Sequence, residues 1–359
     1  MTPERAPSFA ERLQQAWLAR GALAHAMLPL AWLFGAATAF RRALYRFGLL
    51  RTSRLPVPVI IVGNLIAGGA GKTPTVIAIV ATLRRHGFVP GIVSRGYGGS
   101  NAGELEVTRV IPAAVCGDEP LLMHLRTGAP LVVAADRVAA ARLLLRAHPQ
   151  VNVIVSDDAL QHLALARDVE VLVFDERGAG NGWLLPAGPL RETLPLTVPA
   201  RSLVVYNAAV ASTPLPGALA RRSLAGVVPL SDWWRGEPAS RAALEALQGR
   251  SILAAAGLAR PQRFFQMLRD CGLAISELPL PDHHAFAALP WPANSSDVAL
   301  TEKDAVKLDP SRVGATRVWV APLDFALDAK FEAALIALLA PIGSRHGNTP
   351  AEPARLPDL

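Results

Sequence analysis

The chain has 359 residues, of which 51% are hydrophobic and 18% are charged, and its formal net charge is +7. This length suits two domains, and the composition excludes a disordered or fibrous chain. The apolar fraction exceeds that of most freely soluble proteins, so we expect part of the surface to meet lipid. Two cysteines, Cys116 and Cys271, cannot form a disulfide framework or a cysteine zinc site, which favours a reducing compartment.

The positive charge is concentrated at the N-terminus. Residues 1–54 contain eight arginines against only Glu4 and Glu11, so six of the seven net charges lie there. The basic balance is therefore no evidence for a nucleic-acid groove in the body of the protein. We expect the N-terminal segment to face an anionic surface, and we expect no nucleic-acid partner.

An uncharged stretch of twenty residues, 21–40, lies between Arg20 and Arg41 and is interrupted by Pro29. Its length is roughly that needed to cross a bilayer core. Four interpretations stay open: a spanning helix, an interfacial helix pair bent at Pro29, a signal peptide, and a buried core helix. The arginines that follow the stretch argue against a signal peptide and favour a cytoplasmic position for the rest of the chain.

From Val57 onward the pattern is that of an α/β protein, in which β-branched apolar runs alternate with amphipathic stretches. Residues 57–64 predict a buried strand, and residues 74–87 predict the helix that follows it. The later apolar runs predict a mostly parallel sheet. These runs are 89–94, 130–136, 151–158, 169–175 and 202–207.

A loss of periodicity over residues 207–250 predicts a boundary with a second, smaller α/β domain. The apolar helix expected over residues 328–343 belongs to that second domain in this interpretation. The predicted organisation is a membrane-associated helical segment (1–54), a first α/β domain (55–225), a second domain (226–345) and a frayed tail (346–359).

The strongest chemical signal is GGAGKTP, residues 68–74, between the predicted strand and helix. In a P-loop of this kind, backbone N–H groups turn onto phosphate oxygens, Lys72 reaches the β- and γ-phosphates, and the Thr73 hydroxyl binds Mg²⁺. The strict pattern has glycine at position 66, where this chain has Ile66. We therefore predict that the first domain is a P-loop NTPase-like, mostly parallel sheet domain.

Polar residues at other strand ends predict the rest of the nucleotide site. Asp157 and Asp158 follow an apolar run, where a Mg²⁺-holding acid belongs in a sheet that bears a P-loop. Arg95 follows another run, at the edge where ligands of open α/β sheets bind. Arg191 and Glu192 follow a Pro/Gly-rich loop and could contact phosphate and metal, or form a solvated turn.

The acidic segment CGDEP around Asp118 carries little signal of its own. His283 and His284 could bind a metal, but no third ligand lies nearby at metal-binding spacing. Asp118 and His283 are assigned a role only when the motifs of the whole chain are compared together.

At these residues the sequence resembles the tetraacyldisaccharide 4′-kinase family, the membrane-associated lipid A 4′-kinases of Gram-negative bacteria. The match is collinear over nearly the whole chain and includes LPLAWLFG, VGNLIAGGAGKTP, SRGYGG, GDEP, DDALQH, LLPAGPLRE, PQRFF, PDHHAF and LTEKDAVK. One departure is Ala159-Leu160, where the family usually has Gly-Phe. The resemblance implies transfer of the γ-phosphate of ATP to the 4′-hydroxyl of tetraacyldisaccharide 1-phosphate, giving lipid IVA. It also implies a peripheral or monotopic enzyme at the cytoplasmic face of the inner membrane.

The resemblance implies roles for individual residues, with ATP and Mg²⁺ as cofactors. The implied catalytic set is Asp118, His283, Lys72, Asp157 and Asp158. The implied ATP contacts are Ile66, Ala67, Gly68, Gly69, Ala70, Gly71, Lys72, Thr73, Gln161, His162, Arg95 and Arg191. The implied metal ligands are Thr73, Asp157 and Glu192.

Without the resemblance, the residues indicate only a P-loop phosphotransferase or NTPase attached to a membrane. One alternative is a membrane-associated P-loop ATPase or GTPase that acts as a conformational switch. Another is a scaffold with a vestigial P-loop. The chain has no N-K-x-D guanine-reading motif, although TEKD at 301–304 is a distant look-alike. The sequence makes no prediction of oligomeric state.

Overall fold

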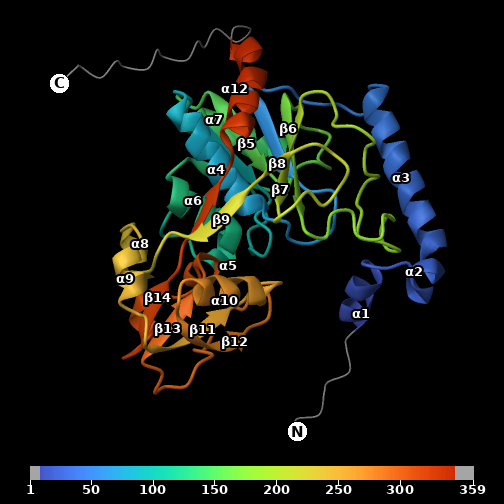
Figure 1. The fold of residues 1–359 in the computed structure, drawn as a ribbon. Coiled ribbons are helices and arrows are strands. Elements are labelled where there is room, and N and C mark those ends of the chain that lie inside the picture. The colour runs from blue at the N-terminus through green and yellow to red at the C-terminus, as the bar shows by residue number, and fades with distance from the viewer. Residues whose placement is uncertain (1–8, 344–359) are drawn as a thin grey trace.

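The computed structural model describes residues 9–343 and contains two lobes, each built on its own sheet (Figure 1). The first sheet has eight strands, which are β1 (Val59–Gly63), β2 (Pro90–Ser94), β3 (Leu105–Glu106), β4 (Leu131–Val133), β5 (Val153–Asp157), β6 (Val169–Asp175), β7 (Ser202–Asn207) and β8 (Ala218–Leu219). Their order is β3-β4-β2-β5-β1-β6-β7-β8, and every neighbouring pair is parallel except β3 with β4. The predicted mostly parallel sheet is confirmed.

Both faces of the first sheet are covered, as its uninterrupted apolar strands require. Its helices are α4 (Lys72–Arg85), α5 (Ala113–Cys116), α6 (Asp118–Thr127) and α7 (Arg137–Ala147). Because side chains alternate along a strand, Ile60 and Val62 of β1 enter the core beneath α4 and α6, whereas Val59 and Ile61 enter the core beneath α7. Strands β1 and β5 are parallel neighbours, so their carboxyl ends lie side by side at the same edge of the sheet.

The second lobe has a smaller sheet with the order β10-β14-β13-β11-β12, in which only β10 and β14 are antiparallel. Its strands are β10 (Val228–Pro229), β11 (Ser251–Ala256), β12 (Ala274–Pro279), β13 (Asp297–Leu300) and β14 (Arg317–Val320). Its helices are α8 (Leu230–Arg235), α9 (Arg241–Glu245), α10 (Pro261–Asp270), α11 (Glu302–Ala305) and the 3₁₀ helix η1 (Pro310–Arg312). Phe264, Phe265 and Leu268 of α10 are buried in a core of this lobe. The predicted second α/β unit is present.

The C-terminal part of the chain leaves the second lobe and returns to the first. Strands β9 (Arg221–Leu224) and β15 (Leu323–Ala326) form an antiparallel ribbon, and β9 lies between the lobes in Figure 1. Helix α12 (Ala329–Gly343) then packs on β6 and β7, with Leu335 and Leu339 buried in a core of the first lobe.

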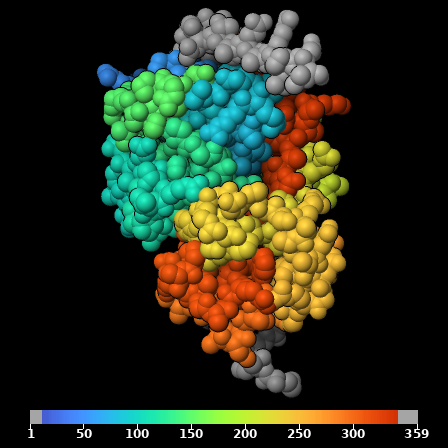
Figure 2. Space-filling model, turned by 90° about the vertical axis from the view of Figure 1, so that its left-hand side faces the viewer, coloured from blue at the N-terminus to red at the C-terminus, as the bar shows by residue number. Residues whose placement is uncertain are grey.

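The placement of the helix 328–343 in the second domain therefore needs correction. Figure 2 shows the red α12 on the upper lobe, above the yellow-to-orange second lobe. The physical reason is that β6 and β7 leave an apolar surface that this apolar helix covers. The predicted tail, 346–359, lies outside the described residues.

The N-terminal segment forms three helices, α1 (Phe9–Ala16), α2 (Ala22–Ala26) and α3 (Leu28–Arg46), beside the first lobe (Figure 1). Helices α2 and α3 are separated at Met27, just before Pro29, as in the bent helix pair. A buried core helix is wrong, because Ala31 is the only buried residue of α3. Within residues 9–343, no helix combines the length and apolar character needed to cross a membrane.

Candidate active site

The loop from β1 to α4 turns tightly into a helix N-terminus. Gly68 and Gly71 have left-handed backbone angles, φ 90° and 91°, which favour glycine. A Cβ atom on Gly71 would overlap the amide of Asn207, and that amide donates to Ala70 O at 3.1 Å. The loop leads into α4, whose first backbone N–H groups have no partner within the helix and suit an anion.

Lys72 is the first residue of α4, and neighbouring side chains hold its ammonium near the loop. Its Nζ lies 3.2 Å from Asn64 Oδ1 and 3.6 Å from Asp158 Oδ1. Asn64 is buried and donates from Nδ2 to Gly68 O at 2.9 Å. Asn64 is not among the predicted site residues, although its position directly after a strand is the same signal that marks Asp157.

Arg177 supports the loop from outside. Its guanidinium donates to Ala67 O at 3.3 Å and to Gly69 O at 2.6 Å. The buried carboxylate of Asp175, at the end of β6, accepts from Arg177 Nε at 3.0 and 3.1 Å. Charge-assisted hydrogen bonds are roughly twice as strong as neutral ones, so this pair keeps the loop carbonyls in one arrangement. No sequence motif marks Arg177.

The paired aspartates at the end of β5 have different surroundings. Asp157 is buried, and its Oδ1 has no hydrogen-bond partner among the described residues. Burial, aided by the Glu119 carboxylate, raises the pKa of Asp157 to about 7. Asp158 has a left-handed backbone, φ 48°, and its carboxylate lies 3.2 Å from Arg191 as well as near Lys72. Asp157 thus offers an open oxygen, whereas Asp158 is neutralised by cations.

Asp157 and Thr73 suit a Mg²⁺ ion that is bound together with phosphates. Mg²⁺ usually takes one or two protein carboxylates and completes its shell with water and phosphate oxygens. The unpartnered, buried Oδ1 of Asp157 is such an oxygen. Thr73 Oγ1 donates to Glu119 Oε2 at 3.2 Å. Within the described part of the chain, no three His, Cys, Asp or Glu side chains form a metal-binding group by themselves.

The loop that carries Arg191 and Glu192 packs against the P-loop, and a 2.7 Å backbone hydrogen bond joins the two. Arg191 donates to Gln161 Oε1 at 3.4 Å, and Gln161 Nε2 donates to Glu192 Oε1 at 3.1 Å. Glu192 also pairs with Arg42 of α3. Glu192, which the resemblance implies as a metal ligand, therefore has the Gln161 amide and the Arg42 guanidinium as partners. Arg42 belongs to the N-terminal helix α3.

His162 and Arg95 lie at the margin of this site. His162 Nε2 is buried without a hydrogen bond, 3.6 Å from Asp136 Oδ1, and burial lowers the pKa of His162. Arg95 is exposed just beyond β2. Near them the buried Arg137 donates to Asp158 O at 3.3 Å and so supports the strained turn.

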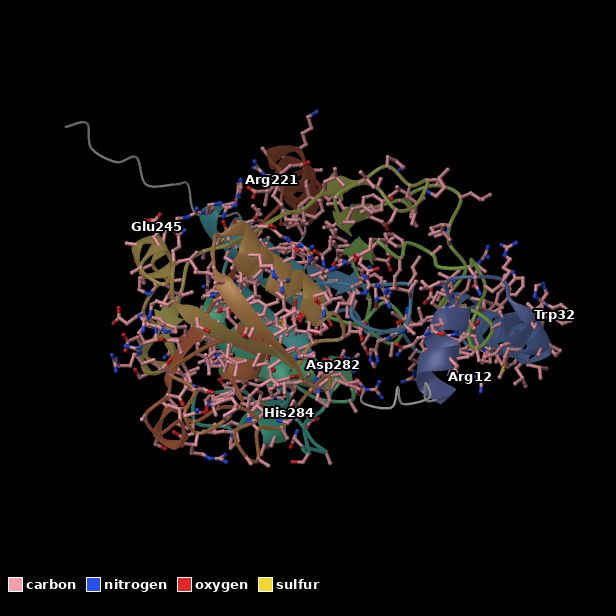
Figure 3. All side chains as sticks on the ribbon, turned by 60° about the horizontal axis from the view of Figure 1, so that its bottom comes forward. Arg12, Trp32, Arg221, Glu245, Asp282 and His284 are labelled. Carbon is pink, nitrogen blue, oxygen red and sulfur yellow. The ribbon has the colours of Figure 1, made fainter. Side chains whose placement is uncertain are left out.

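Asp118 and His283 are in direct contact, although they are 165 positions apart. Asp118 is buried at the start of α6, and His283 lies in the loop after β12. His283 Nδ1 is 2.9 Å from Asp118 Oδ2, and the Tyr97 ring packs edge-on at 5.7 Å between centroids. Figure 3 labels Asp282 and His284, which flank His283 in this loop. The structure thus brings together two residues that only the family resemblance singled out.

Two hollows lie near this pair, and the smaller one is lined by it. A cleft of about 1110 Å³ between the P-loop and the second lobe is lined by Lys72, Glu119 and Lys303, among others. A largely apolar groove of about 530 Å³ is lined by Asp118 and His283.

A phosphate loop at the carboxyl edge of a mostly parallel sheet, with a buried Asp118–His283 pair beside a separate groove, suits a P-loop phosphotransferase. The family model described as tetraacyldisaccharide-1-P 4′-kinase matches residues 23–340. The chain belongs to the tetraacyldisaccharide-1-phosphate 4′-kinase family.

Similar proteins agree with this assignment. The tetraacyldisaccharide 4′-kinase of Methylibium petroleiphilum is 59% identical over 349 residues, which cover 96% of this chain and 97% of that protein. The enzyme of the same name from Leptothrix cholodnii is 54% identical, with 98% and 99% coverage. The crystal structure of LpxK from Aquifex aeolicus in complex with ATP matches with a TM-score of 0.73 and 27% identity, over 88% of this chain and 99% of that chain. The protein is therefore a lipid A 4′-kinase and not the switch ATPase or GTPase that was the alternative.

Proposed function

We propose that this enzyme transfers the γ-phosphate of ATP to the 4′-hydroxyl of tetraacyldisaccharide 1-phosphate, with Asp118 accepting the hydroxyl proton. The contact of 2.9 Å between Asp118 and His283, beside the groove, carries the proposal. A sugar hydroxyl is a poor nucleophile until its proton is accepted, and a positioned carboxylate can accept it. His283 orients that carboxylate by donating from Nδ1.

The nucleotide side of the reaction depends on the P-loop. The amides at the start of α4 and the Lys72 ammonium would bind the phosphates, and Thr73 and Asp157 would hold Mg²⁺. When bound there, Mg²⁺ would neutralise charge on the β- and γ-phosphates. The transition state of phosphoryl transfer is loose and its charge is dispersed, so the protein contributes mainly position and electrostatic stabilisation.

A transfer assay tests this proposal. The purified full-length chain is incubated with γ-labelled ATP, Mg²⁺ and tetraacyldisaccharide 1-phosphate in detergent micelles. We expect label in the lipid, and no label when the acceptor lacks its 4′-hydroxyl. Release of inorganic phosphate at the same rate with or without the lipid would contradict the proposal.

Replacing Arg177 with glutamine should weaken ATP binding about tenfold. Two loop carbonyls lose a charged donor, such hydrogen bonds contribute about 1.5 kcal/mol or more, and about 1.4 kcal/mol is tenfold in affinity. Titration calorimetry measures the affinity, and amide hydrogen exchange over residues 67–73 should become faster. Arg142→Gln, at an exposed position of α7, is the matched control. Unchanged affinity and exchange in Arg177→Gln would remove Arg177 from the site.

We propose further that α2 and α3 attach the enzyme to the cytoplasmic face of the inner membrane as a peripheral or monotopic anchor. An acceptor with four acyl chains is confined to the bilayer, so the enzyme must go to it. Large apolar side chains are exposed on α3 and the turn after it, namely Leu30, Trp32, Leu33, Phe40, Phe47 and Leu49. Trp32 is 69% exposed and lies far from the second lobe in Figure 3. Arginines at the end of α3 suit anionic lipid headgroups.

Serine at Trp32, Leu33 and Phe40 together should lower binding to vesicles that contain anionic phospholipid by at least about 100-fold. Each large apolar side chain contributes about 1.5 kcal/mol or more when it is fully buried. Sedimentation with the vesicles measures binding, and ATP affinity should stay unchanged. The control replaces Leu196 and Val210, which are also exposed, with serine. Equal losses in both variants would show that α3 is not the anchor.

A further inference from the structure

The motif LTEKDAVK, residues 300–307, has no part in the chemistry described so far, yet it forms the short helix α11 beside the Asp118–His283 pair. Asp304 is fully buried and accepts from Thr301 Oγ1 at 2.7 Å, which fixes the first turn. Glu302 pairs with Arg126 of α6 at 2.5 Å, across the two lobes. Helix α11 is therefore held in place relative to α6, the helix that begins with Asp118.

Lys303 extends from α11 into a cluster of charged side chains. Its Nζ lies 3.2 Å from Glu119 Oε1, 3.3 Å from Asp282 Oδ1 and 3.2 Å from His283 Nε2. Burial alone would lower the pKa of Lys303, but the carboxylates of Glu119, Asp118 and Asp282 raise it above its ordinary value. Lys303 is therefore an ammonium, with three donors and no acceptor.

A donor at 3.2 Å determines the protonation of the imidazole. Because the ammonium can only donate, this contact favours a His283 ring in which Nε2 accepts and Nδ1 carries the proton. That proton is donated to Asp118 Oδ2 at 2.9 Å. Both ring nitrogens are thus engaged, and neither has a free lone pair for the proton of an acceptor hydroxyl.

We infer that Lys303 is a positioning residue that keeps His283 as the neutral Nδ1–H tautomer and so leaves Asp118 as the proton acceptor. The inference rests on the proposed function, in which Asp118 accepts the 4′-hydroxyl proton. An imidazolium would direct a second N–H at the Lys303 ammonium, which is a repulsive contact of two donors.

Of the other polar groups around the imidazole, some favour a second ring proton and others oppose it. Asp282 Oδ2, at 3.9 Å from Nε2, favours a proton there, and Lys307, 3.9 Å from Asp118 Oδ2, opposes a positive charge on the ring. Tyr97 contacts the ring by its edge, and Glu119 faces Lys303. Lys303 is nearer to Nε2 than Asp282 is, so its removal should allow Nε2 to take up a proton.

The test replaces Lys303 with methionine, which has a similar length and no charge, in the full-length enzyme. We expect kcat to fall about 100-fold at pH 6 and less than about threefold at pH 9, with the KM for ATP nearly unchanged. Without the facing ammonium, no donor opposes a second ring proton on Nε2, and an imidazolium beside Asp118 would compete for the carboxylate that accepts the hydroxyl proton. The loss should therefore shrink as the pH rises. A loss by the same factor at every pH would overturn the inference and leave Lys303 a structural role.

A spectroscopic readout covers the case in which the variant folds poorly. In ¹⁵N-histidine NMR of the wild-type enzyme, the His283 ring, assigned with His283→Gln, should carry its proton on Nδ1 at pH 7. A proton on Nε2 would overturn the inference. Lys303→Arg keeps the positive charge and should be more active at pH 6 than Lys303→Met. Equal activity of the two variants at pH 6 would contradict a role for the charge of Lys303. Lys330→Met, at an exposed position of α12, is the control.

The inference and the proposed function fail differently. If Asp118→Asn keeps wild-type kcat, Asp118 is not the proton acceptor, whatever the state of the ring. If Asp118→Asn is inactive but Lys303→Met loses activity equally at all pH values, only the role of Lys303 is wrong.

Discussion

Replacing Lys72 with alanine should lower kcat/KM for phosphate transfer to the lipid by about 10³-fold. Lys72 supplies a fixed positive charge where the phosphoryl group develops a dispersed negative charge. Its side chain is only 10% exposed, and charges interact more strongly there than in water. Asn64 at 3.2 Å and Asp158 at 3.6 Å hold the ammonium before ATP arrives, so little reorganisation is needed. Steady-state transfer of labelled phosphate measures the loss.

The fold should tolerate this change, because Asp158 keeps Arg191 as a partner at 3.2 Å. Lys72→Arg should give intermediate activity, since a planar guanidinium keeps the charge but not the geometry of an ammonium. Lys330→Ala, at an exposed position of α12, should be neutral. Near-normal transfer by Lys72→Ala, with an unchanged melting temperature, would show that the P-loop assignment is wrong.

Asp118→Asn and His283→Ala should each lower kcat by about 10² to 10³-fold while the ATP affinity changes little. Asparagine keeps the shape of Asp118 but is a very weak base, and alanine removes the donor that orients the carboxylate at 2.9 Å. The double variant should be hardly worse than the worse single one, as expected for groups that act as a unit. Steady-state kinetics with saturating lipid and ATP separate kcat from KM.

His86→Ala, at an exposed position after α4, controls for the loss of a histidine. Fully multiplicative losses in the double variant would show that Asp118 and His283 act separately. A His283→Ala enzyme with unchanged kcat would leave His283 with a structural role only.

The parts of the nucleotide site that lie close together in the sequence were predictable from it. Residues 57–64, the glycines after them and Lys72 predict a strand, a phosphate loop and a helix, and the structure has β1, the loop and α4 in that order. Asp157 and Asp158 likewise lie at the end of β5 as predicted. These positions follow from local geometry, because a strand end and a helix start fix where the next few residues lie.

Long-range partners were not predictable in this way. The roles of Asp118 and His283 entered only through the family resemblance, and no local pattern marks Arg177. Lys303 lies in LTEKDAVK, a motif of the resemblance that gives it no role. Arg177 reaches Gly69 over 108 positions of sequence. Gly69 follows β1 and Arg177 follows β6, which become neighbours only in the folded sheet. His283 and Lys303 of the second lobe meet Asp118 and Glu119 of the first only when the lobes come together. The sequence around any of these residues therefore does not identify its partner.

The apolar helices near the N- and C-termini also show which features the sequence predicts and which need the tertiary structure. The apolar patterns of residues 21–40 and 328–343 correctly predict helices, and the break at Pro29 was foreseen as one alternative. Pattern shows that a face avoids water but not what covers it, because the hydrophobic effect is non-directional. Only the packed structure places α12 on β6 and β7 of the first lobe and leaves Trp32 of α3 exposed. Adjacent residues therefore determine the local order of strand, loop and helix. The surface that each helix covers, and the meeting of Lys303, His283 and Asp118, are determined by the topology that brings distant parts of the chain together.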